Sequence, residues 1–272
     1  MKRRLTLLVV VACALAGAAA AAASAPLALD QPLGIDVAPN GSLLVVEFGP
    51  RRLVRVAPST GRVTQVASFV KPWGVAHGPS GSAYVSDGGR LRRVDPGRAP
   101  VTVATVGAAF EIGPVAVTPG GDVIYATAYA LYRLRGGRGV PTPIAPGAIL
   151  NGSHGIAVAA DGSLLVADTD DNRILRVRGN AVTTFATIGH PRGIDVSRNG
   201  TVYVAAADAH RIARFGASGK RLGFVGPRFA DPYALSVAKD GTVYALDLGV
   251  TGIIRRIAPD GASSVVRAST AP

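Results

Sequence analysis

The stretch HGIAVAADGSLLVADTDDNRILRVRGNAVTTF, from His154 to Phe185, decides the fold. It contains short runs of Val, Ile, Leu and Thr, which are enriched in strands, and turn residues separate the runs. Asp161-Gly162 supplies the positive φ that a tight hairpin needs. We therefore expect four short antiparallel strands, the last of them over 181–185.

The same unit recurs along the chain. Its turn glycine stands at positions 41, 81, 121, 162, 200 and 241, so successive repeats are 40, 40, 41, 38 and 41 residues apart. The second run of each unit is apolar on both faces, as in Leu43–Val46, and needs cover on both faces. A period near 40 with four strands per unit predicts a propeller. We expect an all-β fold, a six-bladed β-propeller of four-stranded antiparallel blades.

The order of motifs in each unit also resembles a known family. Pro-x-Gly-Ile-x-Val, then Asp-Gly, a strand ending in Ala-Asp, and Asn-Arg-Ile are similar to the NHL repeat. The resemblance covers residues 31–268, is strongest in the fourth unit and weakest in the third, and implies the same six-bladed propeller. Closure of the ring stays open, because residues 263–267 and Leu27–Leu29 are both candidate strands of the last blade.

The N-terminal residues are predicted to be a targeting segment. The basic start MKRR precedes an Ala-rich apolar run over 5–23 and small residues over 23–25. This order is typical of a secretory signal peptide. We expect a signal peptide over 1–25, the propeller over 26–272, and a bacterial protein that is secreted, periplasmic or in the cell envelope. An uncleaved run would be long enough to span a bilayer, and lipidation of Cys13 is a second route to a membrane.

Charge limits the classes of partner. The chain has 29 Lys+Arg and 17 Asp+Glu, and loss of Lys2, Arg3 and Arg4 with the signal leaves a net charge of +9. A basic surface attracts acidic glycans, anionic lipid or nucleic acid. No Lys/Arg block with interleaved aromatics marks a nucleic-acid face. We expect a monomer that binds a small molecule, peptide or glycan outside the cytoplasm, and no nucleic acid. Cys13 is the only cysteine, so the mature chain has no disulfide.

One repeat position is a candidate binding rim. The residue just before the start of each innermost strand should converge with its equivalents at one mouth of the central channel. This position varies between repeats, and four of its six residues are large with polar edges. Aromatic, His and Arg side chains around a mouth are typical of a ligand pocket. The predicted ligand-binding residues are Trp73, His154, Arg192 and Tyr233, with Leu33 and Gly113 in the other two repeats.

A second repeat position is predicted to line the channel. Strand alternation points this position inward, and its residues are Asp36, Ala76, Ala116, Ala157, Asp195 and Ser236. Small side chains suit a narrow bore. Asp36 and Asp195 either help to bind a cation or bond to channel water.

Acids at the end of the second strand are interpreted as structural. Three of them are followed by an Arg across the next turn, and the third repeat lacks both residues. A charge-assisted pair that holds the turn explains why they occur together. The predicted pairs are Glu47 with Arg52, Asp87 with Arg90, and Asp168 with Arg173.

Metal ligands and catalytic residues cannot be assigned from the sequence. The histidines fall at unrelated repeat positions, with His154 on the rim, His77 inside a blade, and His190 and His210 in loops. Zinc needs three or four ligands in a tetrahedron. The acidic run over 168–172 lacks the ligand spacing of a calcium loop. We therefore predict no metal-site residue and no cofactor, and leave the catalytic residues unknown.

Three functions remain open. We expect an exported, non-catalytic propeller that binds a peptide, glycan or small ligand at the rim, because no complete catalytic set is visible. Glu111-Ile112-Gly113-Pro114-Val115 is similar to the Glu-Gly-Pro-Val start of gluconolactonase-type propellers. That resemblance implies a lactonase-type hydrolase with a divalent cation (Ca, Mg or Mn) in the channel. A weaker resemblance to virginiamycin B lyase propellers implies a lyase, with His154 as general base beside a metal.

Overall fold

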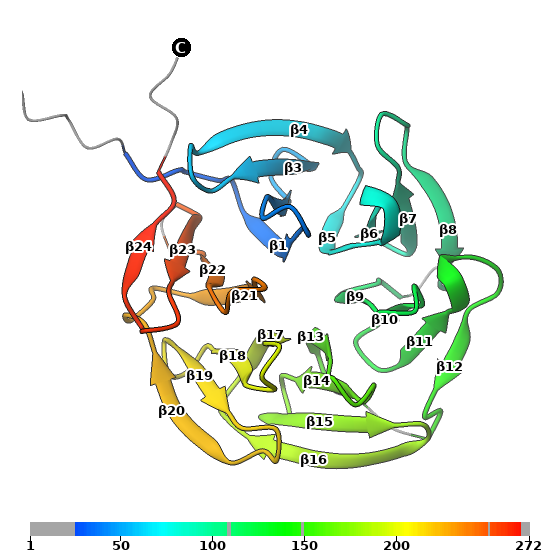
Figure 1. Cartoon of the computed structure of the whole chain (residues 1–272). Coiled ribbons are helices and arrows are strands. Elements are labelled where there is room, and N and C mark those ends of the chain that lie inside the picture. Colours follow the sequence, from blue (N-terminus) through cyan, green and yellow to red (C-terminus); the bar gives the residue numbers. More distant parts are fainter. Residues whose placement is uncertain (1–24, 108–109, 148–149, 250, 268–272) are drawn as a thin grey trace, which may run out of the picture.

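The computed structural model describes residues 25–107, 110–147, 150–249 and 251–267. These residues form a ring of six blades around a central channel (Figure 1). Each blade is a four-stranded antiparallel sheet with its strands in chain order. The predicted signal peptide falls almost wholly outside the described residues. No helix within the described ranges is long and apolar enough to cross a membrane.

The first three blades occupy residues 32–144. Blade one consists of β1 (Pro32–Val37), β2 (Leu43–Glu47), β3 (Arg52–Ala57) and β4 (Arg62–Ser68). Blade two consists of β5 (Pro72–His77), β6 (Ala83–Asp87), β7 (Arg90–Val94) and β8 (Val101–Thr105), with a 3-10 turn over Pro79–Gly81. Blade three consists of β9 (Val115–Val117), β10 (Val123–Ala126), β11 (Leu131–Leu134) and β12 (Thr142–Ile144), with a 3-10 turn over Arg135–Gly137.

The last three blades occupy residues 153–265. Blade four consists of β13 (Ser153–Val158), β14 (Leu164–Asp168), β15 (Arg173–Arg178) and β16 (Ala181–Thr187). Blade five consists of β17 (Pro191–Val196), β18 (Val202–Ala206), β19 (Arg211–Phe215) and β20 (Arg221–Val225). Blade six consists of β21 (Pro232–Val237), β22 (Val243–Asp247), β23 (Ile253–Ile257) and β24 (Ser263–Val265). The predicted fold class is therefore confirmed.

A glycine near the start of four of the six innermost strands allows close packing around the channel. A Cβ atom at Gly34 would lie 2.6 Å from the carbonyl oxygen of Trp73, and one at Gly74 would lie 2.6 Å from that of Gly113. Real Cβ contacts are essentially never shorter than 3.0 Å. Glycine at this position therefore lets neighbouring innermost strands approach backbone to backbone.

The core is divided into layers between neighbouring blades. One cluster joins Leu165 and Ile174 of blade four to Val204 and Phe215 of blade five. Another joins Leu44 and its neighbours in blade one to blade two. This arrangement explains why the second strands are apolar on both faces, since each face packs against a different blade.

In four blades a buried acid holds the loop that leads into the innermost strand. In blade four, Asp168 accepts hydrogen bonds from the Asn151 backbone N–H at 2.6 Å and from Arg173 Nε at 2.7 Å. The corresponding ion pairs are Glu47 with Arg52 at 2.7 Å, Asp87 with Arg92 at 3.8 Å, and Asp247 with Arg255 at 2.7 Å.

The predicted pairing of Asp87 with Arg90 is wrong. Arg90 lies opposite Asp87 in the strand ladder, but its side chain is exposed. Arg92, two residues further along the same face of β7, makes the contact because alternate residues of a strand share a face.

The ring closes with both candidate segments on blade six. Residues 263–265 form its outer strand, β24. The Leu27 N–H donates to the Val266 carbonyl at 2.9 Å, and the Leu29 N–H donates to the Gly252 carbonyl at 2.8 Å. Both leucines are buried in a cluster that contains side chains of blades one and six. The N-terminal segment therefore joins the first blade to the last.

We expect Leu29→Ala to lower the free energy of unfolding by about 2–3 kcal/mol, because it leaves a cavity in this cluster. Chemical denaturation measures the change. Val70→Ala is the control, since the Val70 side chain is 65% exposed. Equal stabilities of the two variants would contradict the role given to the N-terminal segment.

Candidate functional site

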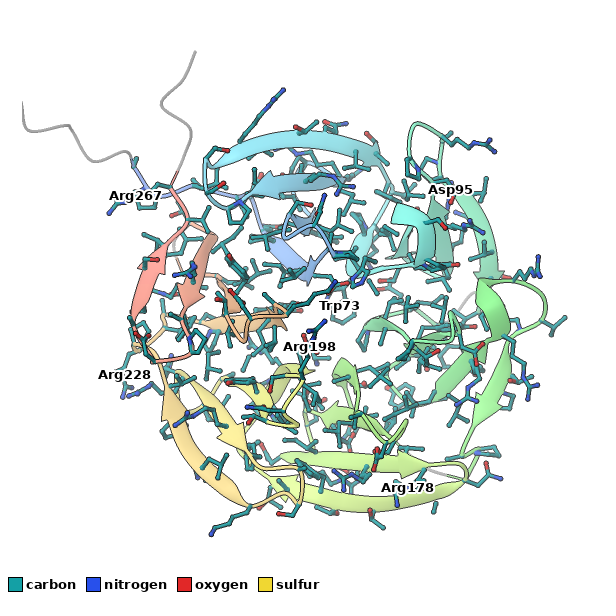
Figure 2. The ribbon with its side chains drawn as sticks, viewed as in Figure 1. Trp73, Asp95, Arg178, Arg198, Arg228 and Arg267 are labelled. Atoms are coloured by element: carbon teal, nitrogen blue, oxygen red, sulfur yellow. The ribbon has the colours of Figure 1, made fainter. Side chains whose placement is uncertain are left out.

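Three predicted rim residues contact one another across the channel mouth. Trp73, His154 and Tyr233 come from blades two, four and six, and Figure 2 shows Trp73 near the centre of the ring. The His154 ring lies edge-on to Trp73, with centroids 5.4 Å apart, and to Tyr233, with centroids 6.0 Å apart. Trp73 Nε1 donates a hydrogen bond to the Tyr233 hydroxyl at 3.0 Å. We call these three side chains the rim triad.

The fourth predicted rim residue lies against the rim triad. The Arg192 guanidinium lies 5.0 Å from the centroid of the Tyr233 ring, and its Nη1 pairs with Asp231 at 2.6 Å. His154 Nδ1 is 2.7 Å from the Gly152 carbonyl. Burial lowers the pKa of His154 and raises the pKa of Tyr233. The structure thus gathers all four residues, but much of their polar surface faces other protein groups. Their predicted ligand binding stays a prediction.

A cavity of about 860 Å³ occupies the channel beside the rim triad. Its walls include Trp73 and His154 at one end, but not Arg192 or Tyr233. At the other end it is lined by turns between the first and second strands of blades one to three, namely residues 39–40, 79–82 and 118–121. We infer that the rim triad closes one end and that ligands enter from the face with these turns.

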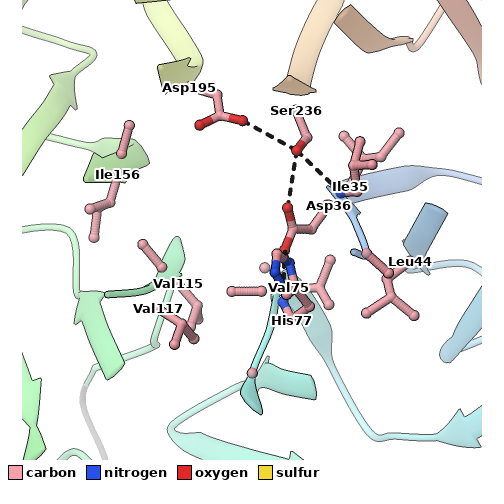
Figure 3. A pocket seen from close by; sticks show the side chains of 18 of the residues that line it. Ile35, Asp36, Leu44, Val75, His77, Val115, Val117, Ile156, Asp195 and Ser236 are labelled. Carbon is pink, nitrogen blue, oxygen red and sulfur yellow. Dashed lines mark hydrogen bonds and ion pairs between the residues drawn. The ribbon is translucent and has the colours of Figure 1, made fainter. Parts of the chain in front are cut away.

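The cavity has one apolar side and one side on which polar residues lie among apolar ones such as Ile35 and Val75 (Figure 3). The apolar wall carries Val115, Val117 and Ile156. The polar wall carries Asp36, His77, Asp195 and Ser236. Asp36 and Asp195 thus lie where the sequence predicts channel-lining residues, and a pocket with few polar groups against apolar surface suits an organic ligand.

A hydrogen-bond network connects the polar wall. Asp36 Oδ2 accepts from the backbone N–H of His77 at 2.7 Å and lies 2.6 Å from His77 Nδ1. Ser236 Oγ lies 3.0 Å from Asp36 Oδ1 and 3.2 Å from Asp195 Oδ2. A hydroxyl has one proton to donate, so two carboxylates share one donor. The network crosses blades two, one, six and five.

His77 is the residue that the sequence analysis missed. It was expected inside a blade, but its side chain is 37% exposed and lines the cavity. Its ring turns to Asp36 of blade one, and this hydrogen bond raises the pKa of His77 against the opposing effect of burial. A signal was present, because the equivalent repeat positions are all valine: Val37, Val117, Val158, Val196 and Val237.

Asp195 is expected to titrate far above an ordinary aspartate. Burial, and secondarily the nearby charge of Asp36, raise its pKa to about 6. The folded state therefore holds this proton more tightly than the unfolded chain. The contribution of Asp195 to the free energy of unfolding is greatest below pH ~4 and is lost as the pH rises through about 6.

Carbon-13 NMR titration of the Asp195 carboxyl tests this expectation. The predicted midpoint is about 6, and Asp36→Asn should lower it because a neighbouring negative charge is removed. A midpoint near the ordinary value of about 4 would contradict a desolvated carboxyl.

The rim does not fit a divalent cation. Calcium and magnesium prefer oxygen ligands, above all carboxylates, and none of the six residues at the rim position is an acid. Glu111, from the gluconolactonase-like motif, makes an ion pair with Lys71. Over the described ranges, no group of three or more His, Cys, Asp or Glu side chains could hold a metal ion.

Several solved structures are similar to this chain in fold. A gluconolactonase from Xanthomonas campestris is 17% identical over 84% of this chain and 86% of its own, with a TM-score of 0.71. Virginiamycin B lyase from Staphylococcus aureus is 15% identical over 89% and 85%, with a TM-score of 0.68. Regucalcin from Agrobacterium tumefaciens, described as a calcium-binding protein, is 14% identical over 92% and 96%, with a TM-score of 0.69. The chain shares their propeller fold.

These likenesses concern architecture alone, because the identities are low. No protein-family model matches the chain, and no curated protein sequence matches it. The NHL resemblance therefore stays a prediction. Propellers of one shape host unrelated activities, so the evidence for function comes from the cavity and not from the fold.

Proposed function

We propose that the protein binds a small organic molecule inside its central channel. The observation that carries this proposal is the cavity of about 860 Å³ with a polar network on one wall. This volume lies within the range of small-molecule sites. The contacts of the rim triad support entry from the opposite face, rather than binding at the rim.

Three alanines support this proposal. Ala76, Ala116 and Ala157 line the cavity at the position where other blades carry Asp36, Asp195 or Ser236. Small side chains on blades two to four keep the bore open on the apolar side. The polar network runs from His77 of blade two through blades one, six and five, which leaves blades three and four apolar and suits a ligand with one apolar and one polar part.

Trp73 provides a direct test, because it is the only tryptophan of the chain and lines the cavity. We expect hits from a small-molecule library to raise the melting temperature and to change Trp73 emission with the same affinity. A library in which no member does both would count against the proposal.

A lactonase-type hydrolase is the second candidate function. Two similar solved structures are a gluconolactonase and a putative gluconolactonase, and the Asp36–His77 pair has the geometry of an oriented general base. Release of acid from a lactone panel in a pH-stat, lost in His77→Gln, would support it. Turnover that depends on added Ca²⁺ or Mn²⁺ and not on His77 would instead favour the metal-dependent form.

We also propose that the protein acts outside the cytoplasm, on the basis of the segment over 1–25. Cell fractionation and N-terminal sequencing test this. A mature protein that starts near residue 26 supports cleavage, and a full-length cytoplasmic protein contradicts export.

A further inference from the structure

Every second residue of each innermost strand points its N–H into the channel, and the last of these positions lies level with the polar network. N–H groups of an antiparallel strand alternate between facing the partner strand and facing away. In blade four, Ala159 donates to the Ser163 carbonyl, so the N–H of the preceding residue, Val158, faces away from β14. The equivalent residues are Val37, His77, Val117, Val196 and Val237.

Four of these six N–H groups are bonded to side chains of the channel position. In three cases the acceptor belongs to the preceding blade around the ring. The bonds are His77 to Asp36 at 2.7 Å, Val37 to Ser236 at 3.2 Å, Val237 to Asp195 at 2.7 Å, and Val196 to Asp195 at 2.7 Å.

The N–H groups of Val117 and Val158 have no such acceptor. The preceding blades carry Ala76 and Ala116 at the channel position. Within the described ranges neither N–H bonds to a side chain or a turn, and strand register turns both away from the second strand. Both valines line the cavity. A backbone donor is seldom left without a partner, so these two N–H groups can take an oxygen acceptor from water or from a ligand.

The carboxylates of the channel do not demand a cationic ligand. Asp36 accepts from His77 and Ser236. Asp195 accepts from the backbone of Val196 and Val237. Their oxygens are therefore already bonded to protein donors.

The open end of the channel carries unpaired positive charge. Arg198, in the turn between β17 and β18, is exposed and lies near the centre of the ring in Figure 2. Within the described ranges it makes no hydrogen bond or ion pair. Lys239, in the turn between β21 and β22, is close enough to act on the charge of His77. Arg55 also lines the cavity. Asp240 lies in the same turn as Lys239, but its carboxylate accepts hydrogen bonds from Thr242. Arg198 has no such partner within the described ranges and can attract an anion.

We propose that the channel binds a small organic acid, whose carboxylate accepts hydrogen bonds from the N–H groups of Val117 and Val158. His77, held through Nδ1 by Asp36, leaves Nε2 as a third donor when protonated, and Asp36, Asp195 and Lys239 are the charged groups that act on its charge. The apolar wall packs against the remainder of the ligand. This inference rests on the proposed channel site.

Three probes with the same phenyl group separate the outcomes. Phenylacetate, phenylacetamide and phenethylamine are titrated against the full mature chain, with Trp73 emission as the readout. We expect phenylacetate to bind at least about tenfold more tightly than the other two. Equal or tighter binding of the amide or the amine overturns the inference but leaves the channel site standing. Binding by none of the three overturns the inference, and the library screen then decides separately whether the proposed function fails with it.

Two variants of Ala116 test where the carboxylate of the ligand binds. Ala116→Asp puts an acid where Asp36 and Asp195 stand in other blades, so it should accept the Val158 N–H, repel phenylacetate and reverse the preference toward phenethylamine. Ala116→Leu adds bulk without an acceptor, so it should weaken all probes and keep the preference for the acid. If Ala116→Asp folds, by circular dichroism, and still prefers phenylacetate, the assigned donors are wrong.

Discussion

Asp168→Ala is expected to lower the free energy of unfolding by about 3–5 kcal/mol, the usual range for breaking a buried charged pair. Asp168 is fully buried and joins the Asn151 backbone to Arg173. Removal of the carboxylate leaves the Asn151 N–H and Arg173 Nε without this acceptor, while Arg173 keeps its pair with Asp171. The loop that leads into β13 loses its attachment to the blade. Urea denaturation monitored by circular dichroism measures the loss.

The matched control is Asp171→Ala. Asp171 also pairs with Arg173, at 2.9 Å, but its side chain is 36% exposed, and exposed pairs contribute about 0–1 kcal/mol. Similar losses in the two variants would mean that the buried acids do not hold the blades. A loss confined to Asp168→Ala supports their structural interpretation.

Ala116→Phe is expected to reduce probe affinity by about a hundredfold or more, since added bulk fills the channel. Ala116 lines the cavity and is 9% exposed, so it has more free surface than Ala76 or Ala157. Titration with phenylacetate measures the loss, and the melting temperature shows whether the variant folds.

Thr102→Phe adds the same ring to the exposed outer strand β8 and serves as the control. It should leave probe binding unchanged. Unchanged affinity in a folded Ala116→Phe protein would contradict binding in the channel.

The fold was predictable because its signals are local and repeated. The hairpin glycines, such as Gly41 and Gly162 with φ of 81° and 79°, recur with the blade period. Glycine at Gly34 and at equivalent positions is needed because neighbouring strands approach closely there. Repeat position alone also predicted that four side chains lie at one rim, namely Trp73, His154, Arg192 and Tyr233.

The details of the site were not predictable, because they depend on contacts between blades. Nothing in the sequence shows that Trp73 bonds to Tyr233, which is 160 residues away, and so joins alternate blades across the mouth. The His77 ring was expected inside the blade. It lines the cavity instead, because Nδ1 makes a hydrogen bond with Asp36 of the neighbouring blade. The free N–H groups of Val117 and Val158 follow from strand register together with alanines in adjacent repeats.

A crystal structure of the mature protein with phenylacetate tests the central claim most directly. We expect phenylacetate to lie inside the channel, between Trp73 and His77. Its carboxylate should accept hydrogen bonds from the N–H groups of Val117 and Val158. A probe bound on the outer side of the rim triad, or a channel that stays free of probe at saturating concentration, would contradict it.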